Sequence, residues 1–136
     1  PPLVKMATGE VSDDETLGGA EMHSKVSGNS DYLAQDEMDA IRIARELMQY
    51  LNTDKNTYIA DNEVVEPLYN PDDLYGIVSA DFHQPYDARE VIARFADGSD
   101  FHEFKPDFAP TLVTGFCKVH GYPLAVIANN GVLFSD

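Results

Sequence analysis

The most regular alternation of apolar and polar positions lies in Asp36–Leu51. Its apolar residues recur every three or four positions, which places side chains on one face of an α-helix. They are Ala40, Ile41, Ala44, Leu47, Met48 and Leu51. Asp36 is suited to cap this helix, and Arg42 and Arg45 fall outside the stripe, where we expect solvated or ion-paired side chains. We therefore predict a helix over 36–51 whose apolar stripe packs on the body of the protein or on a neighbouring subunit.

The pattern from Asp87 to Gly98 predicts a second helix. Asp87 and Glu90 have the spacing of a capping box, in which each side chain satisfies a free N–H of the first turn. The apolar face of this helix is expected to comprise Val91, Ile92 and Phe95. Gly98 is a suitable left-handed stop, because glycine adopts positive φ without steric cost.

Two β-branched and apolar segments follow, Thr111–His120 and Leu124–Asn129, with Gly121-Tyr122-Pro123 between them. This composition predicts a hairpin or a pair of strands. The second strand, expected to be buried, ends in Asn129-Asn130-Gly131. A polar, glycine-containing exit from a buried strand is where α/β proteins place ligands.

Shorter elements are expected in the first 34 residues. Thr8-Gly9-Glu10 predicts a turn, and Ser12 with Glu15 predicts a capping box that opens a helix of one or two turns. Gly18-Gly19 should end that helix. The polar segment Ala20–Ala34 indicates a loop with at most one short strand.

The middle of the chain has the composition of a linker. Asn52–Val65 is poor in apolar residues and rich in Asn, Asp and Thr, and two prolines follow in Glu66–Pro71. We place a domain boundary at 52–71. A turn of helix is expected in Asp72–Val78, where two aspartates precede apolar residues.

The charge balance narrows the partners that the chain can have. It carries 24 acidic and 9 basic residues, a formal net charge of −15. Nucleic acids and anionic membranes bind through clusters of Lys and Arg, so we expect neither as a partner. No apolar run approaches the length that spans a bilayer.

Two single residues carry little chemistry of their own. Cys117 is the only cysteine and lies within a predicted strand, which favours a small buried apolar residue over a nucleophile. His23 has no second ligand at metal spacing, so we expect a structural hydrogen bond there and no metal site.

Several motifs, in order along nearly the whole chain, resemble one family. They are PPLVKMATGE at 1–10, LGGA at 17–20, His23, Ser27-Gly28, EPLYNPDDLYGIV at 66–78, DAREVIARFADG at 87–98, TLVTGF at 111–116 and HGYPLAVIANNGVLF at 120–134. They are similar to the carboxyltransferase (β) subunit of biotin-dependent acyl-CoA carboxylases. Within that family the likeness is greatest to methylcrotonoyl-CoA carboxylase, with geranyl-CoA carboxylase a near relative.

The resemblance implies an α/β fold of the ClpP/crotonase superfamily. It also implies an internal fragment of a longer subunit, which spans the end of one half-domain and the start of the next. Residues 1–51 would then complete the N-terminal carboxyltransferase half-domain, 52–71 would be the interdomain linker, and 72–136 would begin the C-terminal half-domain.

The reaction implied by the resemblance moves CO2 from carboxybiotin to 3-methylcrotonyl-CoA in leucine catabolism. A dienolate of the thioester attacks the CO2, and backbone N–H groups of glycine-rich turns stabilise the oxyanions. Both turns are expected outside this sequence, so no catalytic residue is assigned and the fragment alone is expected to be inactive. Biotin would be carried by the partner α subunit, acyl-CoA would be the substrate, the β subunits would self-associate, and no metal is needed.

The resemblance further implies a cytoplasmic location in bacteria or the mitochondrial matrix in eukaryotes. Two segments are candidates for the wall of the biotin or acyl pocket, because of where they would lie in the family's fold. They are Thr8, Gly9 and Glu10, and Asn129, Asn130 and Gly131. For each, the alternative is a turn with a structural role only.

Three hypotheses follow for the function. The first is a carboxyltransferase part acting on 3-methylcrotonyl-CoA, geranyl-CoA or another acyl-CoA. The second is a CoA-binding module without catalysis, which the absence of clustered Lys and Arg disfavours. The third is a structural or assembly element that contacts the biotin-carrying subunit.

Overall fold

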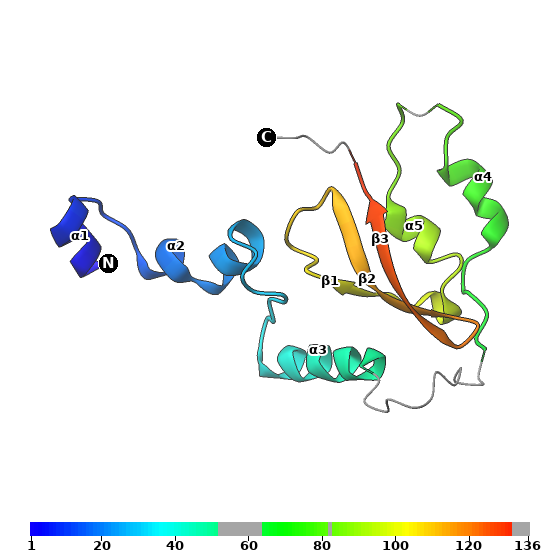
Figure 1. The fold of residues 1–136 in the computed structure, drawn as a ribbon, viewed down its shortest axis with the longest axis horizontal. Helices are drawn as coiled ribbons and strands as arrows, with labels where there is room; N and C mark the ends of the chain where they lie inside the picture. The colour runs from blue at the N-terminus through cyan, green and yellow to red at the C-terminus, as the bar shows by residue number, and fades with distance from the viewer. Residues whose placement is uncertain (52–63, 82, 132–136) are drawn as a thin grey trace.

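The computed structural model describes residues 1–51, 64–81 and 83–131. Most of the predicted linker core, 52–63, therefore lies outside the described residues. The N-terminal residues form an arm of short helices that projects away from a small sheet, and helix α3 lies below that sheet in the view of Figure 1. Two short helices, α4 and α5, lie on the other side of the sheet from the arm.

The arm contains α1 (Pro2–Thr8), α2 (Asp14–Gly18) and the π-helix η1 (Met22–Val26). The cap of α2 is Asp13, whose carboxylate accepts from the backbone N–H of Thr16 at 2.9 Å. The prediction of Ser12 as the cap was therefore wrong by one residue.

The segment expected to be a loop with at most one strand also differs from the prediction. It contains the helical residues 20–26. His23 makes the structural hydrogen bond expected of it, since its Nδ1 lies 3.1 Å from the Ser27 hydroxyl. Polar composition concealed this helix, because its buried residue is Ser24 and not a large apolar side chain that would show a helical period.

Helix α3 (Glu37–Tyr50) confirms the strongest prediction from the sequence. The Asp36 carboxylate accepts from the N–H of Asp39 at 2.8 Å and so caps the first turn. Arg42 is ion-paired as expected, with its guanidinium 2.6 Å from Asp39 and 2.8 Å from Glu46. These pairs lie three and four residues apart, the spacing at which helical side chains meet.

The expected turn of helix after the linker is present. It consists of the 3₁₀ turn η2 (Pro71–Asp73) followed by α4 (Leu74–Ile77). The Asn70 side chain accepts from the N–H of Asp72 at 3.0 Å, and Pro71 occupies the first helical position, where its missing N–H costs nothing.

Helix α5 (Ala88–Ile92) begins at Asp87, whose carboxylate accepts from the N–H of Arg89 at 2.9 Å. The capping box is only half formed, because the Glu90 carboxylate pairs with Arg94 at 2.8 Å instead of reaching back. The helix ends at Ile92, so the prediction of a helix that continues to Gly98 was too long. Gly98 does adopt a left-handed conformation, with φ 61°, but inside the separate 3₁₀ turn η3 (Asp97–Ser99).

The buried side of this region differs from the expected face. The fully buried residues are Ala88, Ile92 and Ala96, each four positions apart, whereas Phe95 is exposed. The sequence favoured the larger apolar side chains. The small side chains of Ala88 and Ala96 pack against the sheet instead, because alanine lets the backbone of this region approach the strands closely.

The sheet is antiparallel with the order β1-β2-β3. Its strands are β1 (His102–Phe104), β2 (Leu112–Val119) and β3 (Tyr122–Asn129), so the predicted hairpin is confirmed and β1 was missed. The hairpin turn is His120-Gly121, with φ 52° and 76°. Two successive positive φ values are those of a type I′ turn, which matches the twist of the flanking strands.

One face of the sheet forms the core. Val113 and Cys117 of β2 pack with Ala88, Ile92 and Ala96, and all five are buried. Strand β3 is different, since most of its residues are exposed, including Ile127 at 77%. The expectation of a buried strand before Asn129 was therefore wrong for the described chain, where β3 is an edge strand.

Cys117 behaves as the small buried residue that the sequence indicated. It is fully buried, and burial raises the pKa of its thiol to about 11. At pH 8 only about one thiol in a thousand is then ionised in the folded state. We expect iodoacetamide to label Cys117 slowly in the folded protein and rapidly in urea, with folded-state labelling rising as the pH approaches 11. Rapid labelling of the folded protein at pH 8 would contradict this burial.

Candidate functional site

The six candidate residues fall into two groups that the described structure does not bring together. Thr8, Gly9 and Glu10 lie at the end of α1, far out on the N-terminal arm, whereas Asn129 is the last residue of β3 and Asn130 and Gly131 follow it at the sheet (Figure 1). A single pocket built from both groups is therefore not formed by these residues alone.

The Thr8-Gly9-Glu10 segment is a helix stop. Gly9 has φ 77°, a conformation that favours glycine, and its N–H donates to the carbonyl of Lys5 at 3.0 Å. The Thr8 hydroxyl donates to the carbonyl of Val4 at 2.9 Å and accepts from the N–H of Glu10 at 3.3 Å. The Glu10 side chain is exposed, so the described residues supply none of the burial that a general base needs.

Asn130 joins three parts of the fold. Its side-chain oxygen accepts from the N–H of Ala88 at 2.7 Å, at the start of α5. Its side-chain nitrogen lies 3.3 Å from the carbonyl of Pro110, and its backbone N–H donates to Thr111 at 2.8 Å. The Asn130 carboxamide is thus used to hold the strand exit against α5, and it is not free to bind a ligand.

The other two residues of that group are exposed. No described residue bonds the Asn129 side chain, and a Cβ placed on Gly131 would lie 3.7 Å from the Thr111 methyl, an ordinary contact. Within the candidate segment, Asn129 and Gly131 are therefore the residues available to a ligand, and Asn130 positions them.

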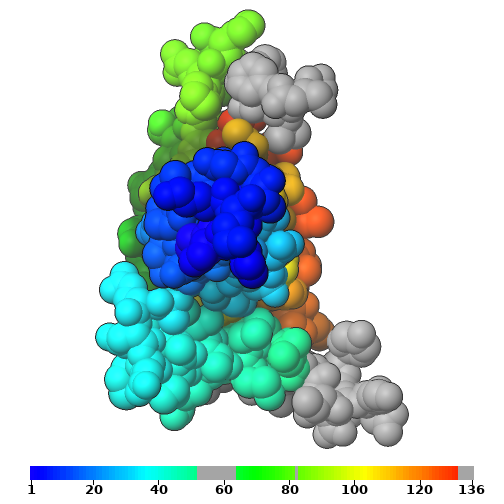
Figure 2. All heavy atoms as spheres, turned by 90° about the vertical axis from the view of Figure 1, so that its left-hand side faces the viewer, coloured from blue at the N-terminus to red at the C-terminus, as the bar shows by residue number. Residues whose placement is uncertain are grey.

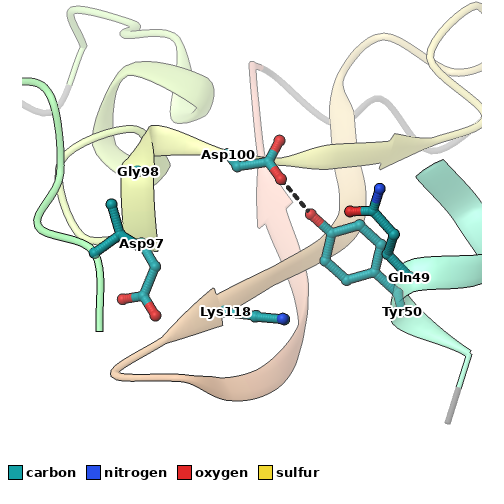
Figure 3. A pocket seen from close by; sticks show the side chains of 7 residues that line it. Gln49, Tyr50, Asp97, Gly98, Asp100 and Lys118 are labelled. Atoms are coloured by element: carbon teal, nitrogen blue, oxygen red, sulfur yellow. Dashed lines mark hydrogen bonds between the residues drawn. The ribbon is translucent and has the colours of Figure 1, made fainter. Parts of the chain in front are cut away.

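A pocket of about 320 Å³, which the sequence did not indicate, lies between the C-terminal end of α3 and the sheet. The residues around it are Gln49, Tyr50, Val65, Asp97, Gly98, Asp100 and Lys118 (Figure 3). The Tyr50 hydroxyl donates to Asp100 at 2.9 Å, and burial followed by this hydrogen bond holds the pKa of Tyr50 well above its usual range. Tyr50 is therefore a neutral donor throughout the physiological pH range.

The carboxylates of this pocket are already engaged. Asp97 accepts from the N–H of His120 at 2.8 Å and from that of Gly121 at 2.6 Å, so it fastens the hairpin turn. Asp100 accepts from Tyr50. The pocket consequently holds two carboxylates with structural partners, and its acidity disfavours a phosphate ligand.

A second hollow of about 300 Å³ surrounds the buried His102 of β1. The Nε2 of His102 lies 3.0 Å from the Tyr32 hydroxyl, and its Nδ1 lies 3.7 Å from Glu46 of α3. The Tyr50 ring stacks on His102 with 5.7 Å between centroids. These contacts fasten residues 32–50 to the sheet, and no local pattern around His102 could reveal partners so far away in sequence.

Five basic side chains that could bind the phosphates of CoA are already paired with carboxylates. Each of the following residues has a carboxylate partner within 3.5 Å: Lys25, Arg42, Arg89, Arg94 and Lys105. Arg89 also links α5 to β1, since two of its nitrogens contact Glu103 at 2.8 and 2.5 Å. The charge of these five side chains is balanced where they lie, which disfavours phosphate binding by them.

The described residues contain no group of three or more His, Cys, Asp or Glu side chains placed to hold a metal ion. None of their helices combines the length and the apolar character needed to cross a bilayer.

Comparison with known proteins gives matches over the whole chain. The chain is 58% identical over 137 residues to a probable biotin-dependent acyl-coenzyme A carboxylase beta2 subunit of Mycobacterium tuberculosis, covering 100% of this chain and 26% of that protein. It is 48% identical to the mitochondrial methylcrotonoyl-CoA carboxylase beta chain of Dictyostelium discoideum, covering 100% of this chain and 23% of the relative. The chain thus spans about a quarter of the length of the curated relatives that it matches.

The fold is similar to that of a crystallised relative. The transcarboxylase 12S structure, which describes hexamer assembly and has methylmalonyl-coenzyme A and methylmalonic acid bound, matches with a TM-score of 0.81 and 38% identity. The match covers 96% of this chain and 25% of that one. The described helices and small antiparallel sheet are accordingly part of a crotonase-like carboxyltransferase fold. Residues 1–136 also match the sequence model of the family described as the carboxyl transferase domain, and the chain therefore belongs to that family.

Proposed function

We propose that this chain is part of the carboxyltransferase subunit of a biotin-dependent acyl-CoA carboxylase, which moves CO2 from carboxybiotin to 3-methylcrotonyl-CoA. The observation that carries the proposal is the identity along the whole chain to methylcrotonoyl-CoA carboxylase beta subunits, at 48% for Dictyostelium discoideum and 47% for Mycobacterium tuberculosis. The 12S subunit, with its methylmalonyl ligands, supports an acyl-CoA as the substrate class.

The acyl group is the finer part of the proposal. Geranyl-CoA or another acyl-CoA is the alternative substrate. The chain is also 36% identical to a propionyl-CoA carboxylase beta chain, so the alternatives include smaller acyl groups.

The division of the chain into half-domains also belongs to the proposal. Residues 1–51 would end the first half-domain, 52–71 would link the two, and 72–136 would begin the second. Direct contacts cross this boundary, because Tyr32 and Tyr50 pack on His102. Under this proposal the two half-domains are in contact within one subunit and are not independent bodies on a flexible tether.

This part of the subunit would shape the site without performing the chemistry. The oxyanions that form on biotin and on the thioester need preorganised N–H donors, which the proposal places in glycine-rich turns of the full-length subunit outside these residues. Biotin would arrive on the α subunit, and copies of the β subunit would associate. A purely structural role in assembly is the second candidate, and the structural use of Asn130, Asp97 and Thr8 favours it for this segment.

The proposed reaction is tested with the full-length subunit, its biotin-carrying partner, ATP and labelled bicarbonate. We expect label in the acyl-CoA product, with kcat/KM for 3-methylcrotonyl-CoA at least tenfold above that for geranyl-CoA and propionyl-CoA. A higher value for geranyl-CoA or propionyl-CoA would move the assignment to that substrate. No label with any acyl-CoA, from an intact assembly, would leave the structural role as the better reading.

Substitutions of two neighbouring asparagines test whether the residues at the end of β3 line the biotin or acyl pocket. Asn129→Ala should lower kcat/KM about tenfold, the effect of losing one hydrogen bond of about 1.4 kcal/mol to substrate or biotin, while the melting temperature stays unchanged. Asn130→Ala should instead lower the free energy of unfolding by about 1–3 kcal/mol, because the N–H of Ala88 loses its acceptor. If Asn129→Ala keeps full activity, Asn129 does not line the site.

A further inference from the structure

The first turn of α5 is held against the sheet from two sides. On one side, the carboxamide oxygen of Asn130 accepts from the N–H of Ala88 at 2.7 Å. On the other side, the Arg89 guanidinium donates to the carboxylate of Glu103, the central residue of β1. Two adjacent residues of α5 therefore link the exit of β3 to the strand at the opposite edge of the sheet.

The contact between Arg89 and Glu103 has a defined geometry. The Nε atom lies 2.8 Å from one carboxylate oxygen, and Nη2 lies 2.5 Å from the other. A guanidinium that binds a carboxylate through two nitrogens fixes the direction of approach as well as the distance. Glu103 itself is fixed, because it pairs with Gly115 of β2 within the sheet. Strand β1 thus sets the position of the first turn of α5.

The burial of this ion pair indicates that stability is not its main contribution. The Glu103 side chain is 17% exposed and the Arg89 side chain 36%. Charges that are taken out of water lose hydration, which offsets much of their mutual attraction, and apolar residues of similar size often replace such a pair without loss of stability. The two-nitrogen contact, in contrast, fixes a geometry that apolar side chains do not reproduce.

We propose that Arg89 and Glu103 are positioning residues for the exit of β3, at 129–131. They hold the N–H of Ala88 where Asn130 accepts it, and Asn130 in turn fixes the residues on either side of it. The inference rests on the proposed function, because it takes 129–131 to line the biotin or acyl pocket. Neither Arg89 nor Glu103 touches substrate or biotin in this role.

A displaced pocket wall is expected to affect the chemical step. A shift of about 1 Å in a group that orients the reactants can lower the rate about a hundredfold. Loss of an interaction that is made only in the transition state lowers kcat and kcat/KM equally and leaves KM unchanged. We therefore expect loss of the ion pair to lower kcat while KM for the acyl-CoA is retained.

The test replaces the ion pair by apolar side chains, as Arg89→Met with Glu103→Leu, in the full-length subunit with its biotin-carrying partner. We expect kcat to fall about tenfold with KM within about twofold, and the melting temperature to stay within about 3 °C of wild type. Arg89→Met alone should lower the melting temperature further, because it leaves the Glu103 carboxylate without its partner.

A folded double variant with the wild-type kcat would overturn the positioning role, since the pair would then only fasten the helix. If the double variant does not fold, Glu103→Gln decides by the same values of kcat and KM. It keeps the size of the side chain and one acceptor but loses the second charge-assisted bond.

The matched control is Lys25→Met with Glu21→Leu. These residues form an exposed ion pair, with 3.0 Å between nitrogen and oxygen, four residues apart. They lie on the N-terminal arm, which projects toward the viewer in Figure 2, and not on α5 or the sheet. An exposed pair contributes little, so kcat and the melting temperature should both remain those of wild type. An equal fall in kcat in this control would mean that charge loss, and not position, lowers the rate, and would overturn the inference.

Hydrogen exchange of the Ala88 amide reports the same displacement without any activity. Its N–H is bonded to Asn130, so exchange in the Arg89→Met, Glu103→Leu subunit should be at least tenfold faster than in wild type and in the control. Unchanged exchange in an assembly that carboxylates acyl-CoA would overturn the inference and leave the proposed function standing. Faster exchange, with no labelled product from the wild-type assembly, would keep the link from β1 to the exit of β3 and overturn the proposed function.

Discussion

Gly115→Ala is expected to disrupt the sheet and to lower the free energy of unfolding by about 1–3 kcal/mol or more, the usual cost of overpacking. Gly115 lies in the middle of β2 and pairs with Glu103 of β1 and Val126 of β3. A Cβ at this position would come within 2.5 Å of both the His102 carbonyl oxygen and the Phe101 ring. The carbonyl belongs to the backbone of β1, so relief requires the strand itself to move.

Gly76→Ala is the matched control for this substitution. Gly76 lies in α4, and a Cβ there would have nothing within 4 Å. Alanine favours a helix over glycine by up to about 1 kcal/mol, so Gly76→Ala should leave the melting temperature unchanged or raise it slightly. Thermal unfolding of the two variants of the full-length subunit compares them directly. Equal melting temperatures would mean that β1 does not approach β2 as described.

Asp97→Ala is expected to cost about 2–4 kcal/mol, because it removes two charge-assisted hydrogen bonds to the hairpin turn. The Asp97 carboxylate accepts from the N–H groups of His120 and Gly121, both of which have positive φ. Without that acceptor the turn keeps its unfavourable conformation but loses the contact that compensates for it. The register of β3, and with it the position of Asn129, should become less well defined.

The control for Asp97→Ala is Asp107→Ala. The Asp107 side chain is exposed and makes no hydrogen bond or ion pair among the described residues, so its loss removes charge without removing a turn contact. Hydrogen exchange of the Gly121 amide reports the difference locally. Asp97→Ala should speed that exchange by at least tenfold, whereas Asp107→Ala should not. Unchanged exchange in Asp97→Ala would show that the turn is held by its strands alone.

Local chemistry was sufficient to predict elements whose signals lie within a few residues of one another. The Asp36 cap and the apolar repeat defined α3, Asp87 marked the start of α5, and β-branched residues defined the hairpin. Capping and periodicity act over one or two helical turns, so a sequence records them directly. The same reasoning failed for β1, whose three residues are too few to show a period.

The candidate site depended more on contacts that are distant in sequence. The sequence indicated Asn129-Asn130-Gly131, but only the fold shows that Asn130 binds the start of α5, 42 residues away. The pocket around Tyr50 and Asp100 joins residues 50 positions apart and has no local signature. The family resemblance supplied the reaction, which no spacing or charge pattern in these residues specifies.

By itself the sequence determined helix α3, the start of α5, the hairpin, the buried cysteine and the family, because each leaves a local or linear record. Tertiary structure decided which face of each element is covered. In α3 Tyr50 and Glu46 contact His102, and Ile41, Met48 and Leu51 of the predicted stripe are exposed. In the α5 region Ala88 and Ala96 are buried with Ile92 in place of Phe95. Periodicity shows that a helix has an apolar face but not what lies opposite it, since the covering surface comes from distant residues or from another chain.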